Sequence, residues 1–245
     1  MTGAARAQPA RLERAHHHRI RATHSYWAVL AAIFVAFFLA ALLPDAPWAT
    51  SVVVLVLCAT LMIAIWTAGW GRAQRSGSTG LAAAAAAAAF VNFFTQGETL
   101  TALLGVIAGL LTIAIAVVIA AGAIAQGEVN SRSVASAICV YMLFGLMFMF
   151  VYGVLASVGD APFFAQGTDG TRSLRLYFSF VTLATLGYGD YTPRGNLGHA
   201  LAVLEALLGQ LYLVTVVAVI VTRLGRPVQR LGKHGKETEN DGTDA

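Results

Sequence analysis

A short run of residues that offer oxygen atoms, Thr-Leu-Gly-Tyr-Gly-Asp, occupies positions 185–190 between two long apolar segments. A cation that sheds its water needs a cage of oxygens, and consecutive backbone carbonyls that face one axis can supply it. Successive carbonyls point the same way only where some residues take φ above zero, which glycine does at little steric cost. Gly187 and Gly189 meet that need, and the hydroxyl of Thr185 adds one more oxygen. The run therefore predicts a backbone site for dehydrated cations.

The pattern Thr-x-Gly-Tyr-Gly-Asp resembles the selectivity filter of potassium channels. By that resemblance the filter runs from Thr185 to Gly189 and the permeant ion is K+. The ion sites that it implies are at Thr185, Leu186, Gly187 and Tyr188. Leu186 stands where this family more often has valine or isoleucine, which changes the side chain but leaves the carbonyl oxygen in place.

The same resemblance implies that residues around the filter support it. Asp190 is expected to accept hydrogen bonds behind the filter, and the ring of Tyr188 to pack outward as a strut. Tyr177 stands where many relatives have a tryptophan, and its hydroxyl can still reach Asp190. Val181 stands where some members carry a carboxylate, so we expect that brace to be absent.

Composition places the chain in a membrane independently of the motif. Hydrophobic residues make up 58% of the 245 residues and charged residues 11%, whereas soluble domains carry about 25% charged residues. Six apolar runs, most of them near the ~20 residues that cross a bilayer as helix, cover 26–43, 49–70, 80–94, 100–126, 134–158 and 197–222. We therefore expect an all-α membrane protein with six transmembrane helices and a re-entrant pore helix and filter between the fifth and sixth. A cleaved signal peptide is the competing interpretation of the first run, although the basic segment before it is long for one.

The distribution of positive charge predicts the orientation. Thirteen of the sixteen basic residues lie before the first run, after the second, after the fourth or after the sixth. The positive-inside rule makes that side cytoplasmic, with both termini on it, and the filter then enters from outside. The third run contains the octet of alanine at 82–89 and is only weakly apolar. If it stayed out of the membrane, however, the later segments would reverse their direction and the filter would face the cytoplasm. We expect a multi-pass protein of the cell membrane.

Two helices are expected to hold the filter. Residues 174–184 should form a short pore helix capped by Thr171 or Ser173. Residues 197–222 should form the inner helix that lines a cavity. Gly209 lies where the resemblance implies a gating hinge, and close helix packing is the equally open alternative.

Polar and apolar positions of the inner helix are also candidates for function. Glu205 is costly to bury, so it either braces the filter by bonding the pore helix, or stays neutral, or faces an outer watery vestibule. We favour the bracing role. Helical spacing gives four candidate cavity-lining residues, Gln210, Leu213, Val217 and Val221.

One chain supplies one filter strand, so a closed ring of carbonyls implies a homotetramer with fourfold symmetry. The expected parts of each subunit are a basic tail (1–25), a four-helix sensor-like domain (26–126), a linker (127–133), a pore domain (134–224) and a short tail (225–245). Residues 100–126 contain no Arg or Lys, and voltage-sensing helices need such charges. We therefore expect no conventional voltage gating.

Other partners and activities are less well specified. The basic residues after position 222 either bind anionic lipid or act only as a topology signal. Two interpretations of His16, His17 and His18 are open: they sense protons or metal ions, or they are only solvated residues of the tail. We expect no enzyme activity, no cofactor other than K+ as the permeant ion, and no nucleic-acid partner. A non-conducting or non-selective subunit with a pore fold, or a multi-pass transporter, remains the alternative.

Overall fold

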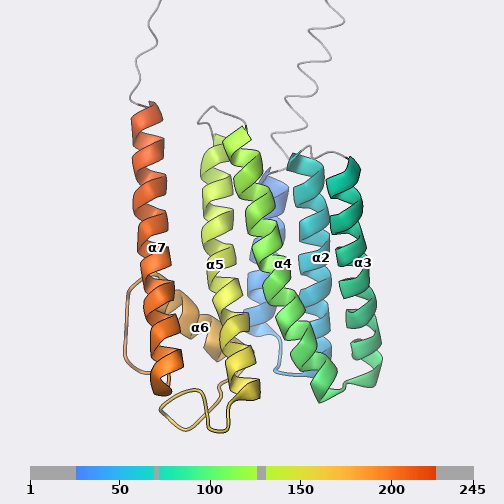
Figure 1. Ribbon diagram of the computed structural model, residues 1–245, viewed down its shortest axis with the longest axis vertical. Coiled ribbons are helices and arrows are strands. Elements are labelled where there is room, and N and C mark those ends of the chain that lie inside the picture. Colours follow the sequence, from blue (N-terminus) through green and yellow to red (C-terminus); the bar gives the residue numbers. More distant parts are fainter. Residues whose placement is uncertain (1–25, 69–71, 126–130, 225–245) are drawn as a thin grey trace, which may run out of the picture.

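The computed structural model describes residues 26–68, 72–125 and 131–224, and these residues are helical apart from loops and an isolated antiparallel bridge between Phe164 and Pro193 (Figure 1). The described part of the chain begins with a helix at Tyr26–Leu42. It continues through α2 (Pro47–Ala68), α3 (Arg72–Thr95), α4 (Glu98–Ala125), α5 (Ser131–Val158), α6 (Arg172–Leu183) and α7 (Gly195–Leu224). The apolar runs thus give the order of the helices correctly.

The starts of α3 and α5 differ most from the expected ones. The weakly apolar third run begins as a helix at Arg72, eight residues before the expected start at 80, and this helix packs on α2. α5 begins at Ser131, inside the expected linker 127–133. Residues 127–130 of that linker, and both terminal tails, lie outside the described residues.

Five of the described helices are long and apolar enough to cross a membrane, namely α2, α3, α4, α5 and α7, and Tyr26–Leu42 is a shorter apolar helix. Figure 1 shows these six helices side by side and alternating in direction, so that the first begins and α7 ends at the same end of the bundle. The protein is a multi-pass membrane protein. The short α6 lies within this bundle, beside α5 and α7.

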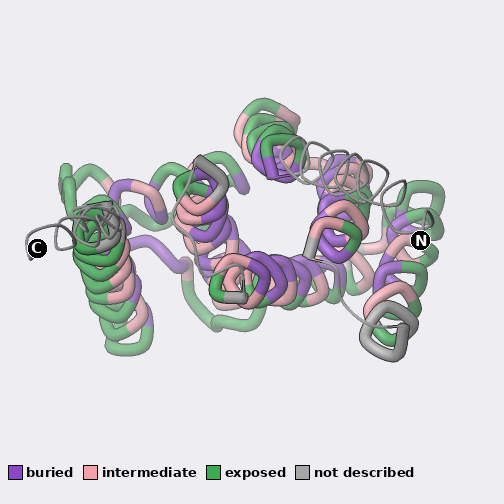
Figure 2. Tube along the Cα trace, turned by 90° about the horizontal axis from the view of Figure 1, so that it is seen from above, coloured by how far each residue is buried: buried purple, intermediate pink, exposed green. Residues whose placement is uncertain are grey.

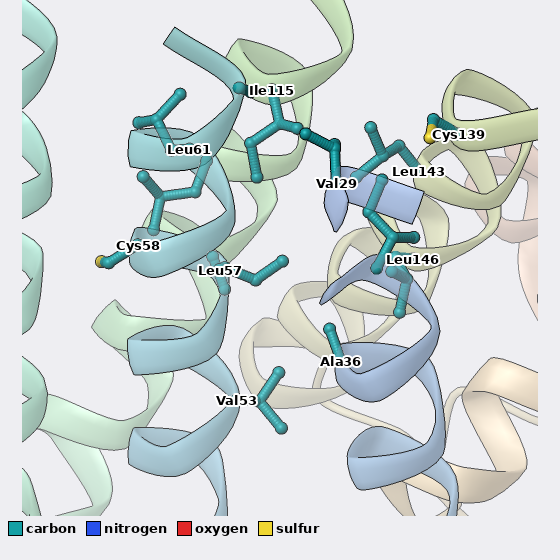
Figure 3. Packing of buried hydrophobic residues seen from close by; sticks show 14 of the residues in the cluster. Val29, Ala36, Val53, Leu57, Cys58, Leu61, Ile115, Cys139, Leu143 and Leu146 are labelled. Carbon is teal, nitrogen blue, oxygen red and sulfur yellow. The ribbon is translucent and has the colours of Figure 1, made fainter. Parts of the chain in front are cut away.

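A single apolar cluster joins the first four helices to α5. Val29 and Ala36 of the first helix, Leu57 of α2, Ile115 of α4 and Leu143 of α5 belong to it and are fully or almost fully buried (Figure 3). α4 packs along α5 and α2. Buried side chains therefore fix the four-helix part to α5, the first helix of the pore region.

α7 differs from the other helices because most of its surface is exposed (Figure 2). It touches α5 and α6 and lies at the edge of the chain, away from α2 and α3. A membrane helix with one covered side is normal at a lipid or subunit contact. The exposed side chains of α7 and of the filter loop are therefore available for contact with lipid or with another subunit.

Candidate functional site

The pore helix α6 starts two residues earlier than expected. Thr171 is its N-cap, with extended backbone (φ −77°, ψ 167°), and the Thr171 hydroxyl accepts a hydrogen bond from the Leu174 N–H at 3.2 Å. Of the two residues that the sequence offered as caps, the structure uses Thr171, and Ser173 lies in the first turn. The helix ends where the Ala184 N–H donates to the Phe180 carbonyl.

The filter backbone alternates between two conformations. φ is +55° at Thr185, +55° at Gly187 and +77° at Gly189, whereas neither Leu186 nor Tyr188 has positive φ. Alternation of right- and left-handed residues turns successive peptide groups to the same side, which a strand cannot do. The two glycines were expected to have positive φ. Thr185 was not, because a β-branched residue is a steric outlier there.

The inner half of the filter is hydrogen-bonded to the last turn of the pore helix. The Thr185 N–H donates to the Thr182 carbonyl at 2.9 Å, and the Leu186 N–H donates to the Val181 carbonyl at 2.9 Å. These bonds use carbonyls that a helix C-terminus leaves without an intrahelical partner. The N–H groups of Thr185 and Leu186 therefore point toward the pore helix.

The outer half is held by side chains. The Tyr177 hydroxyl donates to a carboxylate oxygen of Asp190 at 2.7 Å, as the sequence led us to expect. The rings of Tyr177 and Tyr188 stack with centroids 6.5 Å apart. Gln166, which the sequence did not single out, donates to the Asp190 carbonyl at 3.0 Å and accepts from the Thr192 N–H at 3.3 Å. Nothing in its local pattern marks it, because its partners lie more than twenty residues away in the chain.

Glu205 is fully buried between α5, α6 and α7. Its carboxyl is 2.5 Å from the Tyr152 hydroxyl and 2.5 Å from the Ser179 hydroxyl of the pore helix. Ser179 also lies 2.8 Å from the Gly145 carbonyl, to which only its own proton can form a bond. A protonated carboxyl that donates to Ser179 satisfies all three contacts with the protons available. The vestibule-facing alternative for Glu205 is therefore wrong, and the contact with the pore helix is present.

Glycines let the helices around the filter approach closely. A Cβ atom at Gly209 would collide with the carbonyl oxygen and the side chain of Leu183, at the end of the pore helix. A Cβ atom at Gly145 of α5 would collide with the Phe180 ring. Gly209 thus has a packing reason for being glycine, and α7 runs unbroken through it. Its role as a gating hinge stays a prediction.

Gln210 forms a hydrogen bond with Thr185 that the sequence did not predict. Its side-chain amide nitrogen lies 3.1 Å from the Thr185 hydroxyl oxygen, at the inner end of the filter. Leu213, Val217 and Val221 follow on the same helix, and all three are exposed within the single chain. Their assignment to a cavity stays a prediction.

Arg172, at the start of the pore helix, ties the filter region to the four-helix part. It is almost fully buried, and its guanidinium donates to the carbonyls of Ala40, Leu43 and Pro44 at 3.1–3.3 Å and to the Thr50 hydroxyl at 3.3 Å. Burial lowers the pKa of Arg172, and the charge of Asp45 opposes that effect. The carbonyls end the first helix, where a cation is favourable. The sequence marked Arg172 only as one of the basic residues around the pore loop.

The part of the chain that contains this site is similar to known proteins. Residues 152–226 match the family described as "Ion channel". The chain is 33% identical over 87 residues to the inward rectifier potassium channel Kirbac3.1 of Paramagnetospirillum magnetotacticum, a match covering 36% of this chain and 28% of that protein. It is 37% identical over 89 residues to the protein LctB of Bacillus caldotenax, covering 34% of this chain and 63% of that protein.

These matches cover less than two thirds of either relative, and no solved structure matches the chain. The matched family is one of ion channels and not of enzymes, in agreement with the sequence expectation. The matched residues contain the pore helix α6, residues 185–189 and α7 up to its end at Leu224. Over residues 152–226 the chain is similar to the ion channel family, and over 87 residues it is similar to a potassium channel.

Proposed function

We propose that the protein is a potassium-selective channel in which four copies of residues 185–189 surround one axis and replace the hydration shell of K+ with carbonyl oxygens. The observation that carries this proposal is the alternating sign of φ, positive at Thr185, Gly187 and Gly189. A loop that only connected two helices would have no need to hold a threonine in that strained region.

Four subunits are part of the proposal because one strand cannot surround an ion. Leu186 and Tyr188 are more than half exposed in the single chain, and so are Leu207, Leu211 and Val214 of α7. An exposed apolar helix beside an exposed filter fits a contact with neighbouring copies around the axis. Both termini are cytoplasmic in this arrangement, and the filter opens to the outside.

Conventional voltage gating is not part of the proposal. Each charge that crosses the membrane field contributes about 2.3 kcal/mol per 100 mV, and α4 has no basic residue to carry one. Steep gating currents from the purified channel would contradict this.

The test is ion flux through the reconstituted full chain under opposed K+ and Na+ gradients. The reversal potential is expected to follow K+ and to lose that dependence in Gly187→Ala. Gly167→Ala is the matched control, because both glycines have positive φ (+55° and +81°) and space for a Cβ, but Gly167 lies in the loop before the pore helix. A potential that ignores K+, or equal effects of the two substitutions, contradicts the proposal. Absence of any flux favours a non-conducting subunit.

A further inference from the structure

We propose that Gln210 is a specificity-determining residue of the filter, acting through the hydrogen bond that its side-chain amide donates to the Thr185 hydroxyl. The inference rests on the proposed function, because it assigns a role within the same ion path. It differs from the expectation that Gln210 merely lines a cavity.

The geometry places this amide at the filter by a close helix contact. Gly209 has no side chain, and its backbone lies against the carbonyl of Leu183, two residues before Thr185. The next residue, Gln210, therefore starts beside the inner end of the filter, and its amide nitrogen reaches the Thr185 hydroxyl oxygen at 3.1 Å. Thr185 and Tyr188 are the filter residues with a side-chain oxygen, and Tyr188 stacks on Tyr177.

A threonine hydroxyl has one proton to donate and two lone pairs to accept with. The Gln210 amide occupies one lone pair and fixes the rotation of the hydroxyl, so that the other lone pair is left for the ion. It also helps to hold Thr185 at φ +55°, which a β-branched residue does not adopt without support. Without the amide, the hydroxyl turns freely and can close around an ion smaller than K+. Discrimination against Na+ is then expected to fall.

The decisive variant is Gln210→Met, which keeps the length of the side chain and removes the donor. In the reconstituted full chain we expect the K+/Na+ permeability ratio to fall about fivefold, the factor that a hydrogen bond of typical net strength represents. Leu204→Met, an exposed position of the same helix to which no role in the ion path is assigned, is the control and is expected to change the ratio little. Gln210→Asn, whose shorter side chain cannot span the 3.1 Å contact, is expected to behave as Gln210→Met and serves if the latter fails to assemble.

A double-mutant cycle separates action through Thr185 from a general effect on the helix. Thr185→Val removes the hydroxyl at nearly constant shape. In that background Gln210→Met is expected to have no further effect on the permeability ratio. If Thr185→Val does not conduct, the K+ and Na+ dependence of the thermal midpoint of the assembled channel gives the same cycle.

The outcomes are distinct. A selective wild-type chain with an unchanged ratio in Gln210→Met overturns this inference and leaves the proposed function standing. The same holds if Gln210→Met has equal effects with and without the Thr185 hydroxyl. A wild-type chain with no selectivity for K+ overturns the proposed function and this inference with it.

Discussion

Thr185 shows how the site departs from local preference. Threonine avoids positive φ more strongly than most residues, so the sequence could predict left-handed backbone at Gly187 and Gly189 but not at Thr185. Three contacts compensate: its N–H bonds the pore helix, its hydroxyl accepts from Gln210, and the next N–H bonds Val181. Strain of order 1–3 kcal/mol persists only where surrounding contacts over-determine the conformation, as they do here.

Glu205 is predicted to act as a neutral group. In Glu205→Gln the amide N–H donates to Ser179 and the amide oxygen accepts from Tyr152, which reproduces the bonds of a protonated carboxyl. We expect this variant to lose no more than about 1 kcal/mol of unfolding free energy and to keep its K+ selectivity. Denaturant unfolding in detergent and flux assays measure the two quantities.

The matched variant Glu205→Leu has similar volume and no polar atom. It leaves the buried hydroxyl of Tyr152 without its partner, and we expect a loss of about 1–3 kcal/mol. A large loss in Glu205→Gln, equal to that in Glu205→Leu, would mean that a charged carboxylate is required and that the neutral assignment is wrong.

On α7, the close contact of Gly209 allows an experiment to distinguish its two possible roles, close helix packing and a gating hinge. In Gly209→Ala the new methyl group meets the Leu183 carbonyl, and overpacking of this kind costs about 1–3 kcal/mol. We expect a lower thermal midpoint of the assembled protein. Gly105→Ala in α4 is the control, since its Cβ meets nothing within 4 Å and its helix propensity improves by up to about 1 kcal/mol. A Gly209→Ala protein of unchanged stability that opens less often would instead favour the hinge.

Arg172 is predicted to hold the first helix against the pore helix. In Arg172→Met three carbonyls and the Thr50 hydroxyl lose a charged donor, and hydrogen bonds to charged groups contribute about 1.5–3 kcal/mol. We expect faster hydrogen exchange over residues 40–50 and lower stability. Arg172→Lys should rescue little, because one ammonium cannot span four acceptors. Arg194→Met, at an exposed site, is the control, and exchange that rises equally in both variants would contradict the role.

The elements themselves were largely predictable, and their mutual contacts were not. Apolar periodicity and Thr171 located the helices and the pore-helix cap because those signals are local. The bonds of Arg172 reach back about 130 residues, and those of Gln210 about 25, so no pattern in either segment encodes them. A contact of Glu205 with the pore helix was expected from the sequence, but its other partner, Tyr152, lies 53 residues away and was not.

The whole chain has two unequal halves. The four-helix part and α5 share one buried core, whereas many apolar side chains of α7 and of the filter are exposed among the residues that the structure describes. The first helix, Tyr26–Leu42, contacts the pore helix through the bond of Arg172 to the Ala40 carbonyl and through Phe37, whose ring packs edge-on against Phe180 at 5.2 Å. In the proposed assembly, α7 and the filter would contact copies of the chain around one axis.

Assembly and ion binding are then linked. If four filter strands share each K+, the ion binds the assembled state and not the separated chains, and it stabilises the former by RT ln(1 + [K+]/Kd), about 2.7 kcal/mol at one hundred times Kd. We expect the purified protein to have about four times the 25.7 kDa mass of one chain and a thermal midpoint that rises with K+. Na+ at equal ionic strength should give a smaller rise, and Gly187→Ala should lose the difference while Gly167→Ala keeps it. A midpoint that responds equally to both ions in the wild-type chain, or a mass of one chain under conditions that conduct, would contradict a filter shared among subunits.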